Sequence, residues 1–208
     1  MPLAMTTTNE NPARTADHPI DPIFLERWSP RAFTAEAMPH AELLTVLEAA
    51  RWAPSSFNAQ PWRFLYAHRE STHWNTFVGL LAEFNRTWAV RAAVLLFVVS
   101  KNVFRPAGSA EEIPSYTHSF DAGAAWAQLA LQASRMGWHA HGMAGFDRER
   151  APLELNLSPE YRVEAAVAIG RRGDPAMLPE ALQARERPSG REHLRHLVFE
   201  GMLPSSTE

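Results

Sequence analysis

Residues 54–62 read Pro-Ser-Ser-Phe-Asn-Ala-Gln-Pro-Trp, a polar loop with proline at both ends. From Pro39 to Ala50 the apolar residues recur at helical spacing. Pro54 ends this helix, because proline disfavours helix at the residue before it. Trp62–Ala67 then has the character of a strand. We therefore expect a rigid loop that joins a helix to a strand.

The chemistry of this loop is that of a ligand contact or of a plain turn. Asn58 and Gln60 follow Ser55 and Ser56, and each amide offers a donor and an acceptor. Such pairs match the edge of a heterocycle in which C=O and N–H groups alternate. Loops rich in Asn and Gln are also common as turns, so composition alone leaves both interpretations open.

A second cluster reads Arg27-Trp28-Ser29-Pro30-Arg31. Its two guanidinium groups and one hydroxyl can converge on a dianionic group, since the fork of arginine matches phosphate oxygens in a bidentate way. The alternative is a solvated basic turn.

Two later segments also suit contact with a ligand. In Gly142–Asp147, Gly145 allows backbone N–H groups to approach a ligand closely, and Asp147 is placed to cap a following helix. Arg171 and Arg172 follow a predicted strand and offer a second contact for an anion. Four loops that each suit part of a phosphorylated heterocycle favour a nucleotide-like cofactor.

The remaining pattern predicts interleaved helices and strands. Ser71–Arg91 is predicted as a helix, Val94–Val99 as a strand buried on both faces, and Val163–Ile169 as an alternating strand. Residues 102–118 have no clear period and are predicted to form an irregular rim or lid. This pattern favours an α+β or α/β sandwich.

The clearest predicted helix is Asp121–Met136, which Gly137 ends. One of its surfaces carries mainly Gly and Ala. Such a surface allows the close approach of another element, either a helix of a partner subunit or part of the protein's own core. The pattern alone does not decide between these two.

Composition limits the remaining possibilities. The chain has 208 residues and no cysteine, which excludes disulfides, thiolate nucleophiles and Cys-type metal sites. We predict one domain over 21–203, with an N-terminal arm at 1–20 and a tail at 204–208. A net charge of −3 gives no basic surface for nucleic acid. The longest apolar stretch, Ala92–Ser100, is too short to span a membrane, so a cytoplasmic protein is expected.

Several known types of site are missing from the sequence. There is no P-loop, nucleophile elbow or Gly-x-Gly-x-x-Gly motif. The pairs His139/His141 and His193/His196 are short of metal ligands and have no nearby set of carboxylates, so no metal site is predicted. A pyridoxal-phosphate enzyme would have to use Lys101, the only lysine.

In order and content these clusters resemble the nitroreductase family of FMN flavoproteins. The matching pieces are Arg-x-Ser-x-Arg, Pro-Ser-Ser-x-Asn-x-Gln-Pro-Trp, Gly-Phe-Asp, Arg187-Pro188 and the closing Leu197–Gly201. The resemblance runs from about Pro22 to Leu203. It implies an α+β sandwich with a central, mostly antiparallel sheet between helices, in an intertwined homodimer with two shared sites.

The resemblance also implies the site residues. Arg27, Ser29 and Arg31 would bind the FMN phosphate and ribityl chain, with Arg171 or Arg172 closing over the phosphate. The loop of the other subunit would line the isoalloxazine, and the backbone at Ala144 and Gly145 would address flavin N5 and O4. The full set of expected cofactor residues is Arg27, Trp28, Ser29, Arg31, Pro54, Ser55, Ser56, Asn58, Gln60, Asn85, Met143, Ala144, Gly145, Arg171 and Arg172. The helix Asp121–Met136 would then be the central helix of the dimer.

The implied reaction is flavin chemistry without a catalytic side chain. NAD(P)H would deliver hydride to FMN and be replaced by an electron-poor small molecule: a nitroaromatic, a quinone or an activated carbonyl. Phe104, Tyr116 and His118 are candidates for the rim that contacts this acceptor. Relatives often carry glutamate at Ala144, and some carry lysine at Trp88. A flavin carrier or sensor without turnover is the alternative, and the natural acceptor and the choice of NADH or NADPH stay unassigned.

Overall fold

A central antiparallel sheet organises the protein in the computed structural model, which describes residues 14–204. Its strand order is β1 (Trp62–His68), β2 (Val94–Lys101), β6 (Tyr161–Gly170) and β5 (His139–Met143). All three pairings are antiparallel, and a register shift lies at Val98/Val99. The predicted arm at 1–20 and tail at 204–208 fall outside the described residues, apart from 14–20 and 204.

Strand β2 lies at the centre of the sheet and is buried along nearly its whole length. Leu95, Phe97 and Val99 belong to one hydrophobic core, whereas its alternate residues, such as Leu96 and Val98, belong to the other. Side chains of a strand alternate between the two faces of the sheet. A strand covered on both faces therefore requires a continuous apolar run, as Val94–Val99 has.

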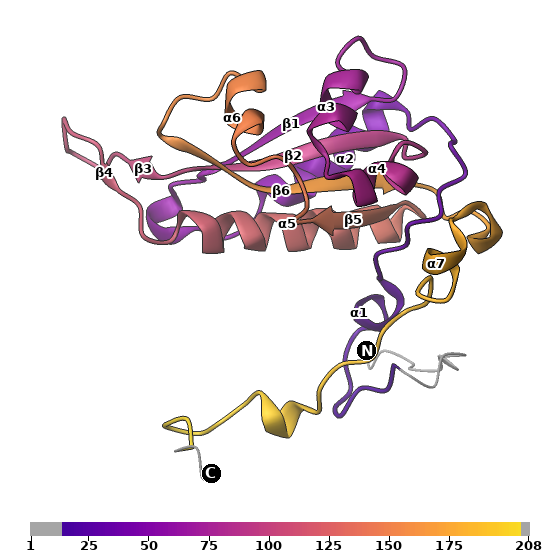
Figure 1. Cartoon of the computed structure of the whole chain (residues 1–208). Coiled ribbons are helices and arrows are strands. Elements are labelled where there is room, and N and C mark those ends of the chain that lie inside the picture. Colours follow the sequence, from indigo (N-terminus) through magenta and orange to yellow (C-terminus); the bar gives the residue numbers. More distant parts are fainter. Residues whose placement is uncertain (1–13, 205–208) are drawn as a thin grey trace.

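Helices cover both faces of the sheet (Figure 1). On one face lie α2 (His40–Arg51) and α5 (His118–Arg135), which pack against each other. On the other lie α3 (Trp74–Leu80), α4 (Glu83–Ala89) and α6 (Arg150–Glu154). The predicted α+β sandwich with an antiparallel sheet is confirmed.

The single helix predicted over Ser71–Arg91 is wrong. The chain forms α3 and α4 with a break at Leu81–Ala82, where Leu81 makes an isolated antiparallel bridge to Phe146. The backbone N–H of Ala82 donates to the carbonyl oxygen of Gly145 at 3.0 Å. This long-range pairing is more favourable here than continuing the helix, and it fixes α4 beside the end of β5.

Helix α5 begins at His118, earlier than predicted, and its small residues face two ways. Ala122, Ala125, Ala130 and Ala133 are buried in the core shared with α2, whereas Gly123 and Ala127 are exposed. The buried side belongs to the protein's own core, and contact of the exposed side with a partner subunit stays a prediction. Strand β5, directly after α5, was not predicted.

Shorter elements complete the chain. Residues 102–118 contain the small hairpin β3 (Val103–Phe104) and β4 (Ile113–Pro114) rather than irregular chain alone. The remaining elements are α1 (Ile23–Glu26), η1 (Ser56–Asn58), η2 (Pro175–Met177), α7 (Glu180–Gln183) and η3 (Leu194–His196).

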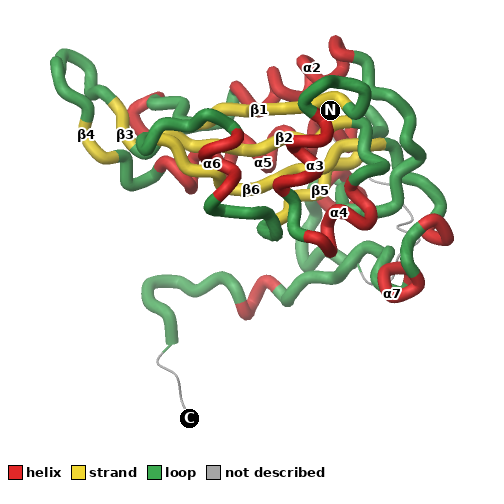
Figure 2. The backbone as a smooth tube through the Cα atoms, turned by 45° about the horizontal axis from the view of Figure 1, so that its top comes forward, coloured by secondary structure: helices red, strands yellow, loops and turns green. Residues whose placement is uncertain are grey.

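The last described part of the chain, which we term the C-terminal arm (residues 184–204), runs past α1 and away from the sheet (Figures 1 and 2). Many of its apolar side chains are exposed: Leu194, Leu197, Val198, Phe199, Met202 and Leu203. In α1, Phe24 is also 55% exposed. Side chains of this kind are normally buried, so the arm presents an apolar surface that the rest of residues 14–204 leaves exposed.

Candidate functional site

The segment Arg27–Arg31 leaves α1 and runs to the edge of the main body. Trp28 and Pro30 are buried and anchor the segment, whereas Arg27, Ser29 and Arg31 are half-buried. Arg27 Nη1 donates to Ser29 Oγ at 3.5 Å. Trp28, predicted as a cofactor contact, is 8% exposed and holds the segment in place.

Glu186 in the C-terminal arm binds the segment Arg27–Arg31. Its Oε1 accepts the backbone N–H groups of Arg31 and Ala32 at 2.7 and 2.8 Å. Its Oε2 lies 3.8 Å from Arg31 Nη1. Arg31 Nε is buried and has no hydrogen-bond partner among the described residues 14–204. The contact joins residues 155 apart in sequence, and no local pattern signals it.

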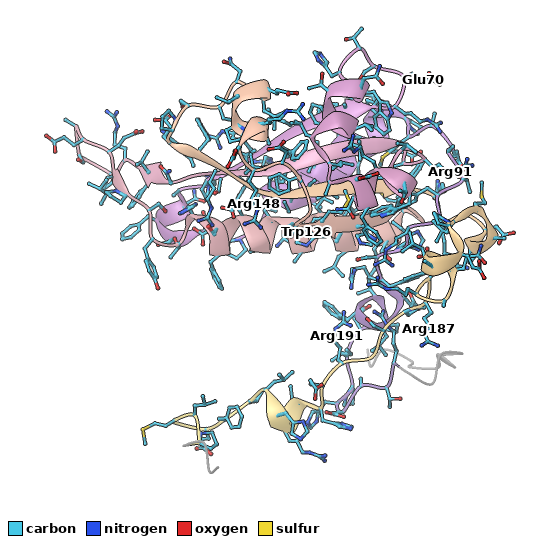
Figure 3. All side chains as sticks on the ribbon, viewed as in Figure 1. Glu70, Arg91, Trp126, Arg148, Arg187 and Arg191 are labelled. Carbon is cyan, nitrogen blue, oxygen red and sulfur yellow. The ribbon has the colours of Figure 1, made fainter. Side chains whose placement is uncertain are left out.

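Burial also shapes the charge of Arg27. Desolvation lowers the pKa of Arg27, and repulsion from Arg191 lowers it further. Arg191 lies beside α1 in the C-terminal arm (Figure 3). No local pattern in the sequence singles out Arg191. A partly desolvated cluster of cations attracts an anion more strongly than a solvated one does.

The ends of β5 and β6 bring further cations to the same place. His139 pairs with Gly170, so Arg171 and Arg172 follow directly beside it. Burial lowers the pKa of His139 to about 4, and repulsion from Arg172, Arg171 and Arg27 adds to this effect. The Nδ1 atom of His139 is buried and has no hydrogen-bond partner in the part of the chain that the structure describes. The structure thus brings Arg27, Arg171 and Arg172 together around one neutral histidine.

The two arginines after β6 differ in their contacts. Arg171 Nη1 donates to the carbonyl oxygen of Met136 at 2.8 Å, and its guanidinium lies 4.1 Å from the ring centre of Trp138. It also pairs with Glu36 at 3.5 Å. Arg172 is exposed and makes no side-chain bond with the rest of the described chain, 14–204. Of the two, Arg172 is the better placed to take a ligand.

Strand β5 continues from this cluster along α4. His141 Nδ1 lies 2.9 Å from the carbonyl oxygen of Pro30, and its ring centre is 4.7 Å from that of Trp88. Trp88 is buried, and within the described range its Nε1 has no hydrogen-bond partner. Gly142 faces Trp126 of α5, whose ring would lie 3.1 Å from an added Cβ (Figure 3).

The residues after β5 form a tight junction with α4. Asn85 Nδ2 donates to the carbonyl oxygen of Gly145 at 2.9 Å. A Cβ at Gly145 would lie 2.7 Å from that same Nδ2, so only glycine fits without a shift. Ala144 is exposed, whereas Met143 is buried in the core. The predicted neighbours Asn85 and Gly145 are therefore brought together.

The loop 54–62 is held by α5. The backbone N–H of Ser56 donates to Asp121 Oδ2 at 3.2 Å, and that of Gln60 donates to Ser55 Oγ at 3.0 Å. Asn58 and Gln60 are exposed and have positive φ angles of 52° and 47°. Asp121 is buried in α5 and was not expected to support this loop.

The candidate rim residues lie near this loop. Phe57 is 82% exposed and stacks on Phe104 with ring centres 5.3 Å apart. Tyr116 is fully exposed. His118 is half-buried at the start of α5 and contacts Ser100.

One chain does not bring its two principal clusters together. Along β2, Val94 pairs with Ile169 at the arginine end, whereas Ser100 pairs with Trp62 at the loop end. Six strand residues separate these positions by roughly 20 Å, at about 3.3 Å each. The loop 54–62 therefore lies at the opposite end of the sheet from Arg27, Arg31 and Arg172.

Within residues 14–204, no group of three or more His, Cys, Asp or Glu side chains is arranged to hold a metal ion. None of the helices in this range is long and apolar enough to cross a membrane.

The chain is similar to known proteins. The description "Nitroreductase family" matches residues 25–86, which contain both principal clusters. A solved structure described as an oxidoreductase containing FMN is 50% identical, covers 97% of this chain and 100% of its own, and superimposes with a TM-score of 0.90.

The chain belongs to the nitroreductase family. Two further proteins are similar to this chain. A 15.4 kDa protein of Mycolicibacterium smegmatis is 39% identical over 127 residues, which are 61% of this chain and 81% of that protein. The Bacillus subtilis protein named "Putative NAD(P)H nitroreductase YdgI" is 25% identical over 165 residues, which are 64% of this chain and 78% of that protein.

Proposed function

We propose that this protein is an FMN-dependent NAD(P)H oxidoreductase that reduces an electron-poor small molecule by a ping-pong mechanism. The observation that carries the proposal is a set of buried polar atoms beside Arg27–Arg31 that have no partner within residues 14–204. Three are the nitrogens Arg31 Nε, His139 Nδ1 and Trp88 Nε1, and the fourth is Glu186 Oε2. Buried polar groups are normally hydrogen-bonded, so this set suits a polar ligand. Supporting evidence is the relative containing FMN, at 50% identity.

Separate groups of residues suit the phosphate, the ribityl chain and the ring system of FMN. Arg27, Ser29, Arg31 and Arg172 would hold the phosphate and ribityl chain, because their donors converge on one partly desolvated surface. The junction of Asn85 and Gly145 offers a rigid polar edge to the ring system. When bound, FMN would supply the chemistry that transfers a hydride from NAD(P)H to the acceptor.

We also propose a homodimer that shares two such sites. The loop 54–62 suits the ring system, yet it lies roughly 20 Å from the arginines of its own chain. Two chains related by a two-fold axis can place the loop of one beside the arginines of the other. The exposed Gly123 and Ala127 of α5, together with the apolar C-terminal arm, provide surfaces for this contact.

The protein's role in the reaction is then to bind, orient and exclude water. No nucleophile or strong base is needed, since the cofactor supplies the electrons. Electron-poor nitroaromatics, quinones and activated carbonyls are the proposed acceptors, and Phe57, Phe104 and Tyr116 offer aromatic surface near the loop. The single-domain assignment over 21–203 remains part of this proposal.

The deciding experiment is the absorption spectrum of the purified protein, followed by anaerobic addition of NADH or NADPH. We expect a flavin spectrum that bleaches rapidly with at least one donor and returns when an acceptor is added. A flavin spectrum that neither donor bleaches would instead indicate the alternative, a carrier or sensor. A protein that binds no flavin would contradict both.

A further inference from the structure

A compact group of titratable side chains lies at the start of α5, away from the arginine cluster. His118 Nδ1 lies 2.8 Å from Ser100 Oγ and 3.6 Å from Glu164 Oε1. Ser100 Oγ donates to Glu164 Oε1 at 2.5 Å, and Ser119 Oγ donates to the same oxygen at 2.9 Å. Ser100 is fully buried. The function proposed above gives this group no role.

The hydrogen-bond pattern fixes the tautomer of His118. Ser100 and Ser119 each have one hydroxyl proton, and both protons are directed at Glu164. Ser100 Oγ can then only accept from His118 Nδ1, so Nδ1 carries a proton. The proton that His118 gains or loses is therefore the one on Nε2.

Glu164 is held in its charged form. Burial opposes its ionisation, but hydrogen bonds from Arg162, Ser100 and Ser119 outweigh burial and keep the pKa of the carboxyl below its usual value. Arg162 binds this carboxylate with Nε at 3.1 Å and Nη2 at 2.9 Å. This carboxylate lies 3.6 Å from His118 Nδ1 and thereby helps to orient the ring.

This group is coupled to the loop 54–62 through two contacts. Ser100 pairs with Trp62 across β1 and β2. Asp121, one turn along α5 from His118, accepts the N–H of Ser56 and the hydroxyl of Thr117. Thus the same turn of helix positions both the imidazole and the loop that we assign to the cofactor ring.

We propose that His118 is the proton donor to the organic acceptor, with Ser100 and Glu164 as the residues that position it. This proposal rests on the proposed function. When a carbonyl carbon receives a hydride, its C=O π electrons move to oxygen. The His118 Nε2–H bond then breaks, an O–H bond forms, and neutral His118 regains a proton from water. The charged groups around the imidazole are Glu164 and Arg162 on β6 and Asp121 on α5.

The test compares two acceptors with the FMN-loaded protein reduced anaerobically. Cinnamaldehyde or menadione, whichever the wild type reduces faster, requires protons as well as electrons, whereas ferricyanide takes electrons alone. For His118→Gln we expect reoxidation by the organic acceptor to slow by about 10²-fold or more, the usual scale for loss of a general acid. Reoxidation by ferricyanide and reduction by NAD(P)H should keep their rates. Glutamine retains a donor for Ser100, and exposed His73→Gln is the matched control.

A second measurement does not depend on turnover. The tautomer of the neutral imidazole of His118 is determined by long-range ¹H–¹⁵N NMR in the wild type and in Ser100→Ala. In the wild type the proton should lie on Nδ1, and Ser100→Ala, which removes the hydroxyl that accepts it, should lose this preference. A wild-type imidazole with its proton on Nε2 would overturn the positioning of His118 by Ser100 and Glu164.

The remaining outcomes are distinguishable. Equal slowing with both acceptors would show that His118 is only structural, and no slowing with either would show that it donates no proton; each result overturns the proposal for His118. Bound flavin that neither NADH nor NADPH bleaches in the wild type would overturn the proposed function, and the role of His118 with it.

Discussion

Asn85 Nδ2 donates to the carbonyl oxygen of Gly145 at 2.9 Å, although 60 residues separate them in sequence. The backbone N–H of Ala82 donates to the same oxygen at 3.0 Å. Two donors from one helix start therefore fix the backbone that leaves β5. The break between α3 and α4 makes this possible, because a continuous helix would have used the Ala82 N–H internally.

Gly145→Ala should disturb this junction and weaken flavin binding. The added Cβ would lie 2.7 Å from Asn85 Nδ2, so the amide has to move and its bond to Gly145 is lost or lengthened. Loss of one such bond costs about 1 kcal/mol. We expect roughly a fivefold rise in the FMN dissociation constant by fluorescence titration, as 1.4 kcal/mol is tenfold. Gly79→Ala in α3, where nothing lies within 4 Å, is the control. Equal affinity in both variants would contradict this assignment.

Arg27→Ala should weaken FMN binding more strongly. A charge-assisted hydrogen bond contributes about 1.5–3 kcal/mol, which corresponds to a loss of affinity of roughly 10- to 150-fold. Riboflavin, which lacks the phosphate, should bind the variant and the wild type equally. Arg150→Ala removes an exposed arginine that pairs with Glu154 on α6 and should leave both affinities unchanged. If FMN and riboflavin lost affinity equally, Arg27 would not be a phosphate contact.

The apoprotein should become less stable as the pH falls from 6.5 towards 4. Burial lowers the pKa of His141 to about 4; the hydrogen bond to Pro30 opposes this shift, and Arg31 adds to it. Burial and three arginines lower the pKa of His139 to about 4 as well. In this window the unfolded chain binds more protons than the folded protein, so protons favour unfolding. For His141 the loss is about 2 kcal/mol at pH 5, or roughly 4–8 °C in melting temperature.

The variant His141→Asn isolates this effect, because its side-chain amide can still donate to the Pro30 carbonyl but does not titrate. Its melting temperature, followed by circular dichroism between pH 7.5 and 5, should depend less on pH than that of the wild type. His73→Gln, which removes an exposed histidine, should retain the full dependence. A wild-type melting temperature that stays constant over this range would contradict a buried, neutral His141.

The sequence was sufficient for the sandwich and for most of its long elements, because their apolar periods follow directly from burial. Val94–Val99 is an example: a strand covered on both faces has to be apolar throughout. Strand β5 was missed because its residues, His-Ala-His-Gly-Met, carry a mixed pattern. As an edge strand beside β6, it is stabilised by pairing rather than by an apolar face of its own. The break at Leu81–Ala82 was missed for a related reason, since its cause lies at Gly145 and Phe146.

In the candidate site, too, some residues could be predicted from the sequence and others could not. The donors Arg27 and Arg31 were visible as a local pattern, whereas Asn85 was implied only by the resemblance to the family. Their supports were not visible, because Glu186 binds the N–H of Arg31 from 155 positions away and Asp121 binds that of Ser56 from 65 positions away. Sequence patterns reveal groups that face a ligand, whereas the groups that hold them depend on the complete fold.

The C-terminal arm supplies the last prediction. Val198 and Leu197 are 61% and 60% exposed in the single chain, and we expect a partner subunit to bury them. Val198→Asp should therefore weaken the dimer. Burial of such a side chain contributes about 1.5 kcal/mol or more, and a two-fold dimer contains the substitution twice. The dimer dissociation constant should rise at least about 100-fold.

Leu153→Asp on α6 is the matched control, because Leu153 is 79% exposed but lies outside the arm. Analytical ultracentrifugation should give twice the 23.3 kDa chain mass for the wild type and the control, and a lower mass with less bound FMN for Val198→Asp. A wild type that is monomeric at micromolar concentration with FMN bound would contradict the shared site, because loop 54–62 would then bind no flavin.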